Sequence, residues 1–369
     1  MRGMICAVLL CALPQAACAQ AEDETEAGAL SSGNFSGLEF RSIGPAFMSG
    51  RISDIEILED SPASWIVGVG SGGVWRTDNA GTTWEPIFDG QGVYSIGAVT
   101  VDPQNPHTIW VGTGENHGGR HVGYGNGIHR SRDGGQTWDH LGLENSEHIS
   151  EILIHPEDSD TIWVAAQGPL WSSGGERGLF KSTDGGQTWS QVLSAGEWTG
   201  VTDVVMDPRN PDRMVAATWQ RHRTVAAYMG AGPESGLHVS EDGGDTWREV
   251  TVGLPDGNMG KIGLAISPQN PDVLYAANRG ESWTRMSDTV SGGTGPHYYQ
   301  ELYAHPHHFD RIILVSNTTQ ISSDGGATFR GLNNENKHVD DHAIAFHPTA
   351  EDYMLVGSDG GLYETHDGD

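Results

Sequence analysis

The chain has 369 residues, enough for a large hydrophobic core, and its 49 Asp and Glu residues far outnumber its 20 Lys and Arg residues. A surface this acidic repels nucleic acid and anionic membranes, so the composition excludes both as partners. The 52 glycines and the short β-branched runs between Gly, Pro, Asn and Asp clusters predict an all-β fold with many tight turns.

Residues 1–19 have the pattern of a secretory signal peptide. Arg2 supplies the positive start, residues 4–13 form an apolar core too short to span a bilayer, and residues 17–19 read Ala-Cys-Ala, a small-x-small cleavage site. We expect cleavage after Ala19 and export to the periplasm or the cell exterior.

A lipoprotein signal built on Cys18 is the alternative, although Gln15 stands where a lipobox usually has Leu. All three cysteines lie inside the predicted signal, so the mature chain is expected to have no disulfide and to depend on its core. Residues 20–38 are acidic and small, which predicts a disordered leader in front of a domain that spans residues 39–369.

An eight-residue box, Ser/Thr-x-Asp-x-Gly-x-Thr-Trp, recurs along this domain. Full copies are "TDNAGTTW" (77–84), "SRDGGQTW" (131–138), "STDGGQTW" (182–189), "SEDGGDTW" (240–247) and "SSDGGATF" (322–329). A worn copy ends at Trp283, and a last copy, "THDGD", begins at Thr365. Three β-runs come before a typical box, the first of them ending in a proline turn, and a fourth run comes after it.

The proline turns recur about every 40 to 60 residues, which is the length of one four-stranded propeller blade. Seven such units can be counted along the sequence. The fifth is shortened, because its second β-run leads straight into the worn box, and the seventh is truncated. We therefore predict a β-propeller of about seven blades.

The boxes are expected to be turn clamps rather than active sites. The acid accepts hydrogen bonds from its own turn, the glycines take positive φ, and the aromatic residue fills space between blades. Asn79 can make the same bonds but is a poor general acid or metal anchor. The residues given this structural role are Asn79, Asp133, Asp184, Asp242, Asp324, Trp84, Trp138, Trp189, Trp247 and Phe329.

A binding site is expected on the rim opposite the boxes, because the long and variable loops belong there. These loops are residues 114–126, 167–178 and 219–236. Aligning the units on their prolines places Arg51, Tyr94, His148, Tyr298 and Asp340 at one level of the axis mouth. Ser53, Ser150, Thr202, Gln300 and His342 lie one pleat deeper. These residues can cradle a ligand, or simply line a channel bridged by water.

The segment "KHVDDH" (337–342) is the densest polar cluster. On an extended strand His338, Asp340 and His342 would face one way and could give a divalent metal three ligands. Glu115, His117, His148 and His297 are candidates for a fourth ligand. The alternative is a hydrogen-bonded His–Asp pair that orients a polar channel. Tyr298 and Tyr299 nearby are suited to stacking on sugar or peptide.

The boxes resemble the Asp-boxes, or bacterial neuraminidase repeats, of sialidases, xyloglucan-cleaving propellers and the sortilin N-terminal domain. The phrases "FRSIGPAFMSGRISDI", "IWVGTGEN", "YGNGIHRSRDGGQTW", "ATWQRHR" and "KHVDDHAIAFHP" are similar to exported bacterial sortilin-like repeat proteins, often labelled "glycosyl hydrolase". Members of that family are usually much longer, so the resemblance implies a fragment or a shortened member.

The resemblance implies two functions, and binding is favoured. Sortilin captures peptides in its propeller, and an acidic mouth with aromatic residues suits a peptide, protein or glycan ligand. An assembly-factor role, like that of the Asp-box propeller used in photosystem II assembly, is a further non-enzymatic option.

Glycoside hydrolysis is the alternative and needs a carboxylate pair at the mouth. The candidates are Asp54, Glu115, Glu151, Asp203, Glu301, Asp340 and Asp341. Xyloglucan-cleaving propellers carry a catalytic Asp before the "GG" of the first blade, but here Gly70 and Ser71 stand at that place. Arg41 loosely matches the first of three sialidase arginines, and no second or third is found.

Overall fold

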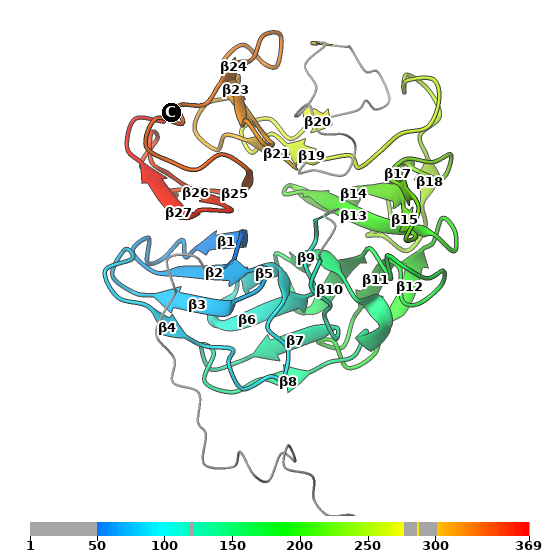
Figure 1. Cartoon of the computed structure of the whole chain (residues 1–369), viewed down its shortest axis with the longest axis horizontal. Helices are drawn as coiled ribbons and strands as arrows, with labels where there is room; N and C mark the ends of the chain where they lie inside the picture. Colours follow the sequence, from blue (N-terminus) through cyan, green and yellow to red (C-terminus); the bar gives the residue numbers. More distant parts are fainter. Residues whose placement is uncertain (1–49, 118–121, 277–285, 288–300, 369) are drawn as a thin grey trace, which may run out of the picture. The chain divides into compact units, whose positions relative to one another are not determined.

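The computed structural model describes residues 50–117, 122–276, 286–287 and 301–368, and in this part the predicted all-β propeller is confirmed (Figure 1). Five sheets of the described chain have four strands and one has three, and each of these six sheets is a blade. Among the described residues, a two-stranded sheet stands at the place of the fifth unit. No helix among the described residues is long and apolar enough to cross a membrane.

The blades follow one another along the chain, and their sheets run in simple antiparallel order. The first has strands β1 Ile52–Ile57, β2 Trp65–Val69, β3 Gly73–Thr77 and β4 Glu85–Pro86. The second has β5 Ile96–Asp102, β6 Asn105–Thr113, β7 Ile128–Ser131 and β8 Asp139–His140, followed by the 3-10 turn η2 Glu144–Ser146. The third has β9 Ile149–His155, β10 Asp158–Ala166, β11 Gly178–Ser182 and β12 Ser190–Leu193.

The fourth blade interrupts this order with a hairpin. Its strands are β13 Thr199–Asp207, β14 Asn210–Gln220, β17 Gly236–Ser240 and β18 Arg248–Glu249, with the hairpin β15 His222–Arg223 and β16 Tyr228–Met229 between its second and third strands. The fifth unit has β19 Leu264–Ile266 and β20 Leu274–Ala276. The sixth blade has β21 Glu301–Ala304, β22 Ile312–Val315, β23 Gln320–Ser322 and β24 Arg330–Gly331, and the seventh has β25 Asp341–Phe346, β26 Met354–Ser358 and β27 Gly361–Thr365.

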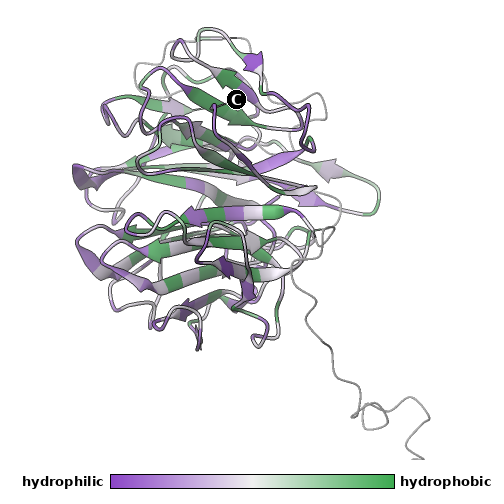
Figure 2. Cartoon of the chain, turned by 90° about the vertical axis from the view of Figure 1, so that its left-hand side faces the viewer, coloured by the Kyte–Doolittle hydropathy of each residue, from purple (hydrophilic) through white to green (hydrophobic). Residues whose placement is uncertain are grey.

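The first strands of the units form a closed inner ring. Strands β1, β5, β9, β13, β19, β21 and β25 contact one another in this order, and β25 returns to contact β1 (Figure 1). Apolar residues are frequent on the strands, and hydrophilic residues are frequent on the connecting loops (Figure 2).

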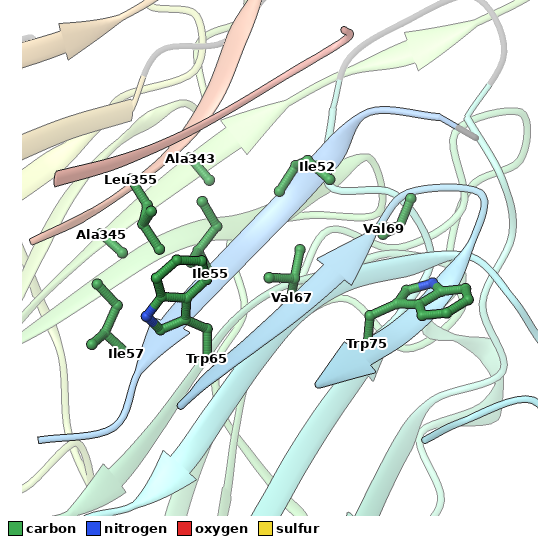
Figure 3. Close-up of a cluster of buried hydrophobic side chains, with 10 residues drawn as sticks. All are labelled: Ile52, Ile55, Ile57, Trp65, Val67, Val69, Trp75, Ala343, Ala345 and Leu355. Atoms are coloured by element: carbon green, nitrogen blue, oxygen red, sulfur yellow. The ribbon is translucent and has the colours of Figure 1, made fainter. Parts of the chain in front are cut away.

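The ring closes through apolar packing between the first and seventh blades. One face of β1, with Ile55 and Ile57, meets Ala343, Ala345 and Leu355 of the seventh blade (Figure 3). All five side chains are at most 9% exposed, so the seam is a genuine part of the core. At about 25 cal/mol per Å² of buried apolar surface, such a seam contributes several kcal/mol to closure.

The boxes and the proline turns lie on the same rim. The backbone N–H of Gly185 in the third box donates to the carbonyl of Asp160, near the start of β10, at 3.0 Å. The N–H of Gly134 donates in the same way to the carbonyl of His107, near the start of β6, at 2.9 Å. Inside the third box, Oδ1 of Asp184 accepts from the N–H of Thr188 at 2.9 Å, and Oδ2 accepts from the Thr188 hydroxyl at 2.6 Å. In the first box Oδ1 of Asn79 accepts from the N–H of Thr83 at 2.8 Å.

Four inner strands carry an acid at equivalent positions: Asp54, Glu151, Asp203 and Glu301. Burial raises the pKa of Glu151 well above its usual value, and the charges of the other three acids and of Glu56 add to this effect. Lys261 contributes a positive charge there, with Nζ 3.3 Å from Oε1 of Glu301. Burial and the charge of Asp54 raise the pKa of Glu56 to about 8.

The clamp role of Asp184 predicts a graded response to substitution. Hydrogen bonds from Thr188, then from Ser182, lower the pKa of Asp184 to about 2, so the ionised clamp stabilises the fold above about pH 4 and loses its effect as the pH falls towards 2. We expect Asp184→Ala to lower the melting temperature at pH 7, and Asp184→Asn to lower it much less, because Asn79 makes comparable bonds. Thermal unfolding at pH 7 and pH 3 checks this, and an unchanged melting temperature in Asp184→Ala would contradict it.

The acids of the inner strands predict that the stability of the folded protein decreases as the pH rises. A carboxyl whose pKa is raised in the folded state binds its proton more tightly in the folded state than in the unfolded state. The contribution of Glu56 to the free energy of unfolding therefore decreases as the pH rises from its unfolded pKa of 4.5 to its folded pKa of about 8. We expect Glu56→Gln to melt like the wild type at pH 5 and at a higher temperature at pH 9. The exposed Glu157→Gln is the matched control and should show no such pH-dependent gain.

Candidate functional site

A groove of about 800 Å³ opens among the long loops, on the rim where the sequence places the binding site. Its walls come from the segment between β4 and β5, the β6–β7 loop, the β10–β11 loop and the β15–β16 hairpin. The residues that line it include Tyr94, Glu115, Tyr124, Trp171, Arg223 and Tyr228.

Three aromatic rings of the groove are presented to solvent. Tyr94 is 67% exposed, Tyr124 is 56% exposed and Trp171 is 45% exposed. Large aromatic side chains are normally buried, so three exposed rings around one groove indicate a surface that a ligand covers. The guanidinium of Arg223 lies over the ring of Tyr228, 4.6 Å from its centre, at the edge of the groove.

Hydrogen bonds between blades hold the groove walls together. Nε2 of Gln167 donates to the carbonyl of Asn116 at 2.8 Å, which joins the loops of the second and third blades. The N–H of Arg223 donates to the carbonyl of Leu170 at 2.9 Å, which joins the third and fourth blades. The shape of the groove is therefore set by the ring rather than by one loop.

Arg51 joins two carboxylates at the axis mouth. Its Nε lies 3.4 Å from Oε1 of Glu115 and 3.5 Å from Oδ1 of Asp359. Arg51 leads into β1, Glu115 follows β6, and Asp359 lies in the β26–β27 turn, so this cluster connects the first, second and seventh blades. The predicted residues Arg51 and Glu115 are thus brought together.

The two carboxylates have opposite pKa shifts. Burial raises the pKa of Glu115 against the opposing effect of Arg51 and of the Gly123 N–H, which donates to Oε2 at 2.8 Å. Burial also acts on Asp359, but the hydrogen bond with His342 and the charge of Arg51 outweigh it and lower its pKa. Carboxyl pairs whose environments separate their pKa values are the usual arrangement for an acid and a base.

Two buried histidines, His342 and His117, lie next to Asp359. Nε2 of His342 lies 2.6 Å from Oδ1 of Asp359, and the ring of His117 meets the His342 ring edge-on at 4.4 Å between centres. Burial lowers the pKa of His342 to about 4 and that of His117 well below its usual value. Both rings are therefore neutral at pH 7, and His342 orients Asp359 as a hydrogen-bond donor.

The other predicted residues have different positions. Tyr94 lines the groove, whereas His148 is completely buried beneath it, with its ring 5.8 Å from that of Tyr124. Burial lowers the pKa of His148 well below its usual value, so it is a neutral residue under the groove floor. Tyr298 and Tyr299, with His297 and Gln300, lie outside the described residues.

The expectation of an extended strand from His338 onwards is wrong. Strand β25 begins at Asp341, and Asp340 has a φ of 63°, which turns the chain just before the strand. The side chain of Asp340 is hydrogen-bonded by Asn317, and the His338 ring contacts the carbonyl of Val339. The alternation that would align His338, Asp340 and His342 is therefore interrupted. Among the described residues no group of three His, Cys, Asp or Glu side chains is arranged to hold a metal ion, and the metal site stays a prediction.

Asp359 is the functional candidate that sequence reasoning missed. It precedes Gly360 and Gly361 in "VGSDGG", the seventh-unit counterpart of "VGSGGVW" in the first unit. A comparison of the β2–β3 and β26–β27 turns would have identified it, because the two segments differ mainly in this acid.

Comparisons with known proteins agree with the fold and with the resemblance. The family described as "Sortilin, neurotensin receptor 3" (Sortilin-Vps10) matches residues 126–260. A xyloglucanase of Paenibacillus sp is 27% identical over 252 residues, which cover 59% of this chain and 23% of the relative. The photosystem II assembly lipoprotein Ycf48 of a Synechococcus strain is 24% identical over 256 residues, covering 66% of this chain and 64% of the relative.

Solved structures show the same fold at low sequence identity. The GH74 xyloglucanase of Xanthomonas campestris superposes with a TM-score of 0.61 at 16% identity, covering 89% of this chain and 53% of the enzyme. Ycf48 bound to D1 peptide has a TM-score of 0.52 at 14% identity, covering 88% of this chain and 97% of Ycf48. The chain spans about a quarter of the length of the xyloglucanases it matches. The chain is thus a β-propeller that is similar to the sortilin family over residues 126–260, and to xyloglucanases and Ycf48 over longer stretches.

Proposed function

We propose that this protein is an exported binding module that holds an extended polymer, a glycan or a peptide, in the groove opposite the Asp-boxes. The observation that carries the proposal is the set of three exposed rings, Tyr94, Tyr124 and Trp171, around one groove of about 800 Å³. Rings of this kind stack on sugar faces and on peptide side chains and add van der Waals contact at low entropic cost.

A neutral polysaccharide is the ligand class that the groove favours. The only carboxylate among the groove residues named above is Glu115, which is buried against Arg51, so the groove offers stacking surfaces more than free charges. Several relatives are named for xyloglucan, whereas Ycf48 has been solved with a peptide, and these names support both ligand classes. Export rests on the signal pattern of residues 1–19.

Removing the stacking rings is expected to weaken binding. Loss of one such ring costs about 1.4 kcal/mol, or roughly tenfold in Kd, so Trp171→Ala and Tyr124→Ala should each weaken binding of xyloglucan oligosaccharides by about this factor. Phe309→Ala, an exposed aromatic of the proline turn between β21 and β22, is the matched control and should bind like the wild type. Isothermal titration calorimetry measures all three. Equal affinity in the groove variants and the control would exclude the groove, and binding of peptides but not of oligosaccharides would exclude the glycan.

Glycoside hydrolysis is the second candidate, favoured by the carboxylates that share Arg51. Two carboxyl groups held about 5 to 10 Å apart are the requirement for this reaction, and both Glu115 and Asp359 approach one guanidinium nitrogen. Glu115, with its raised pKa, would be the proton donor, and Asp359, with its lowered pKa, the base or nucleophile. Asp359 also precedes "GG", as the catalytic Asp of xyloglucan-cleaving propellers does.

A hydrolase would show a bell-shaped pH profile. Activity should fall in acid, below the usual range of Asp359, and in alkali, above the usual range of Glu115. We expect Glu115→Gln and Asp359→Asn to reduce release of reducing sugar from polysaccharides at least a hundredfold, with Glu157→Gln unaffected. If the wild-type protein releases no sugar from a panel of polysaccharides, hydrolysis is excluded and the binding proposal stands.

A further inference from the structure

Two arginines are buried next to the walls of the groove. Arg221 lies between β14 and β15 and is 1% exposed, and Arg177 lies just before β11 and is 2% exposed. Neither guanidinium group lies within 4.0 Å of a carboxylate oxygen of the described chain, and neither residue lines the groove. A buried cation without an ion pair is rare, because it is costly to remove a charge from water.

Each arginine uses part of its guanidinium group to hold a loop of the groove. Nη2 of Arg177 donates to the carbonyl of Ser172 at 2.9 Å, next to the exposed ring of Trp171. Nη1 of Arg221 donates to the carbonyl of His117 at 3.3 Å, which joins the fourth blade to the β6–β7 loop of the second. The two side chains therefore help to position loops of the second, third and fourth blades.

The two guanidinium groups also lie close to each other, because both arginines contact Trp198. Arg177 lies over the Trp198 ring, 5.9 Å from its centre, and the backbone N–H of Arg221 donates to the Trp198 carbonyl at 3.1 Å. The guanidinium of Arg221 lies over the ring of Trp219 at 5.0 Å. Stacking of this kind covers the faces of a guanidinium group but leaves the N–H donors, which lie in its plane, without acceptors.

Three buried nitrogens of these groups have no acceptor. Nη1 of Arg177, and both Nε and Nη2 of Arg221, make no hydrogen bond to any part of the chain that the structure describes. Buried donors in native proteins are almost always paired with protein, water or a bound ion. These three donors therefore indicate that something is bound beside them.

The charges around the two arginines decide between water and an ion. Burial lowers the pKa of each arginine to about 10, so both are charged at pH 7. Glu147 opposes this effect on both, but burial raises the pKa of Glu147 itself, against the Leu170 N–H and the two arginines. Two positive charges and at most one negative charge leave an excess of positive charge among buried groups. Water can accept hydrogen bonds from the donors but cannot balance this charge.

We propose that a small monovalent anion, of the charge and size of chloride, is bound between Arg177 and Arg221 as a resident ligand. A sphere of this size can accept hydrogen bonds from the three nitrogens, and its charge offsets the excess. Because both side chains are enclosed, a group attached to a polymer in the groove is excluded. By neutralising the arginine that holds the β10–β11 loop, the anion fixes the position of Trp171.

The anion should stabilise the wild-type protein. At a chloride concentration tenfold above the dissociation constant, we expect a melting temperature about 2 °C higher than in gluconate at the same sodium concentration. Arg221→Gln removes one charge and two of the three donors and should lose this difference. The exposed Arg132→Gln is the matched control and should keep it. Equal melting temperatures of the wild type in the two salts, or an undiminished difference in Arg221→Gln, would overturn the proposal.

A diffraction experiment covers the case in which Arg221→Gln does not fold. Bromide has the charge of chloride and scatters X-rays anomalously near its absorption edge. Wild-type crystals grown in sodium bromide should show an anomalous peak within hydrogen-bond distance of Nη1 of Arg177 and of Nε or Nη2 of Arg221. Peaks confined to exposed residues, or ordered water alone beside the two arginines, would exclude a resident anion.

Hydrogen exchange tests the effect on the groove. The backbone amides of residues 168–177 should exchange more slowly in chloride than in gluconate, whereas those of the third box, residues 182–189, should exchange equally in both. Equal exchange of residues 168–177 in the two salts would show that no anion holds this loop. None of these measurements uses a polymer ligand, so their failure and the failure of the proposed binding function are distinguishable.

Discussion

Every blade in this ring is a sheet with two faces, and each face must be covered by a neighbouring blade. This demand for burial on both sides determines most of what the sequence shows, including the apolar strands and the box aromatics that fill the space between sheets. It is met everywhere in the described chain only because β25 packs against β1. Without that seam, the first and seventh blades would each expose an apolar face to solvent. The burial of every blade on both faces therefore depends on the contact between these two blades.

Closing the ring also creates the candidate site. Arg51, Glu115 and Asp359 are far apart in sequence and come from three blades, yet they meet at the axis mouth beside the seam. The groove walls are likewise joined by hydrogen bonds between blades. Because these groups lie next to strand ends and are joined by contacts between blades, the shape of the mouth is fixed by the closed ring.

Repetition made the fold predictable from sequence. The boxes, the proline turns and their spacing identified the units, and Asn79 in the first box identified the clamp as structural. The site was less predictable, because it is formed where units differ. Arg51, Tyr94 and Glu115 were predicted from the rim that carries the variable loops, and the structure brings Glu115 close to Arg51 and to the groove that Tyr94 lines. Asp359 was missed, since its acid lies in a short turn, and the alternation at His338 and Asp340 failed because a left-handed residue precedes β25. The periodicity of a sequence predicts strands well, but it does not reveal a single residue with positive φ just before a strand begins.

The seam between β1 and β25 has a consequence for how the molecule folds. Ile52 and Ala343 are neighbours in one cluster although nearly the whole domain separates them in sequence. Contacts of such long separation carry the largest loop-closure entropy, so they form late, after blades built from local hairpins. We therefore expect the blades to assemble outwards along the chain as an open arc, with the joining of its ends as the slow step. Until then, the acidic inner strands remain accessible to solvent and the apolar faces of the first and last blades are the surfaces most prone to association.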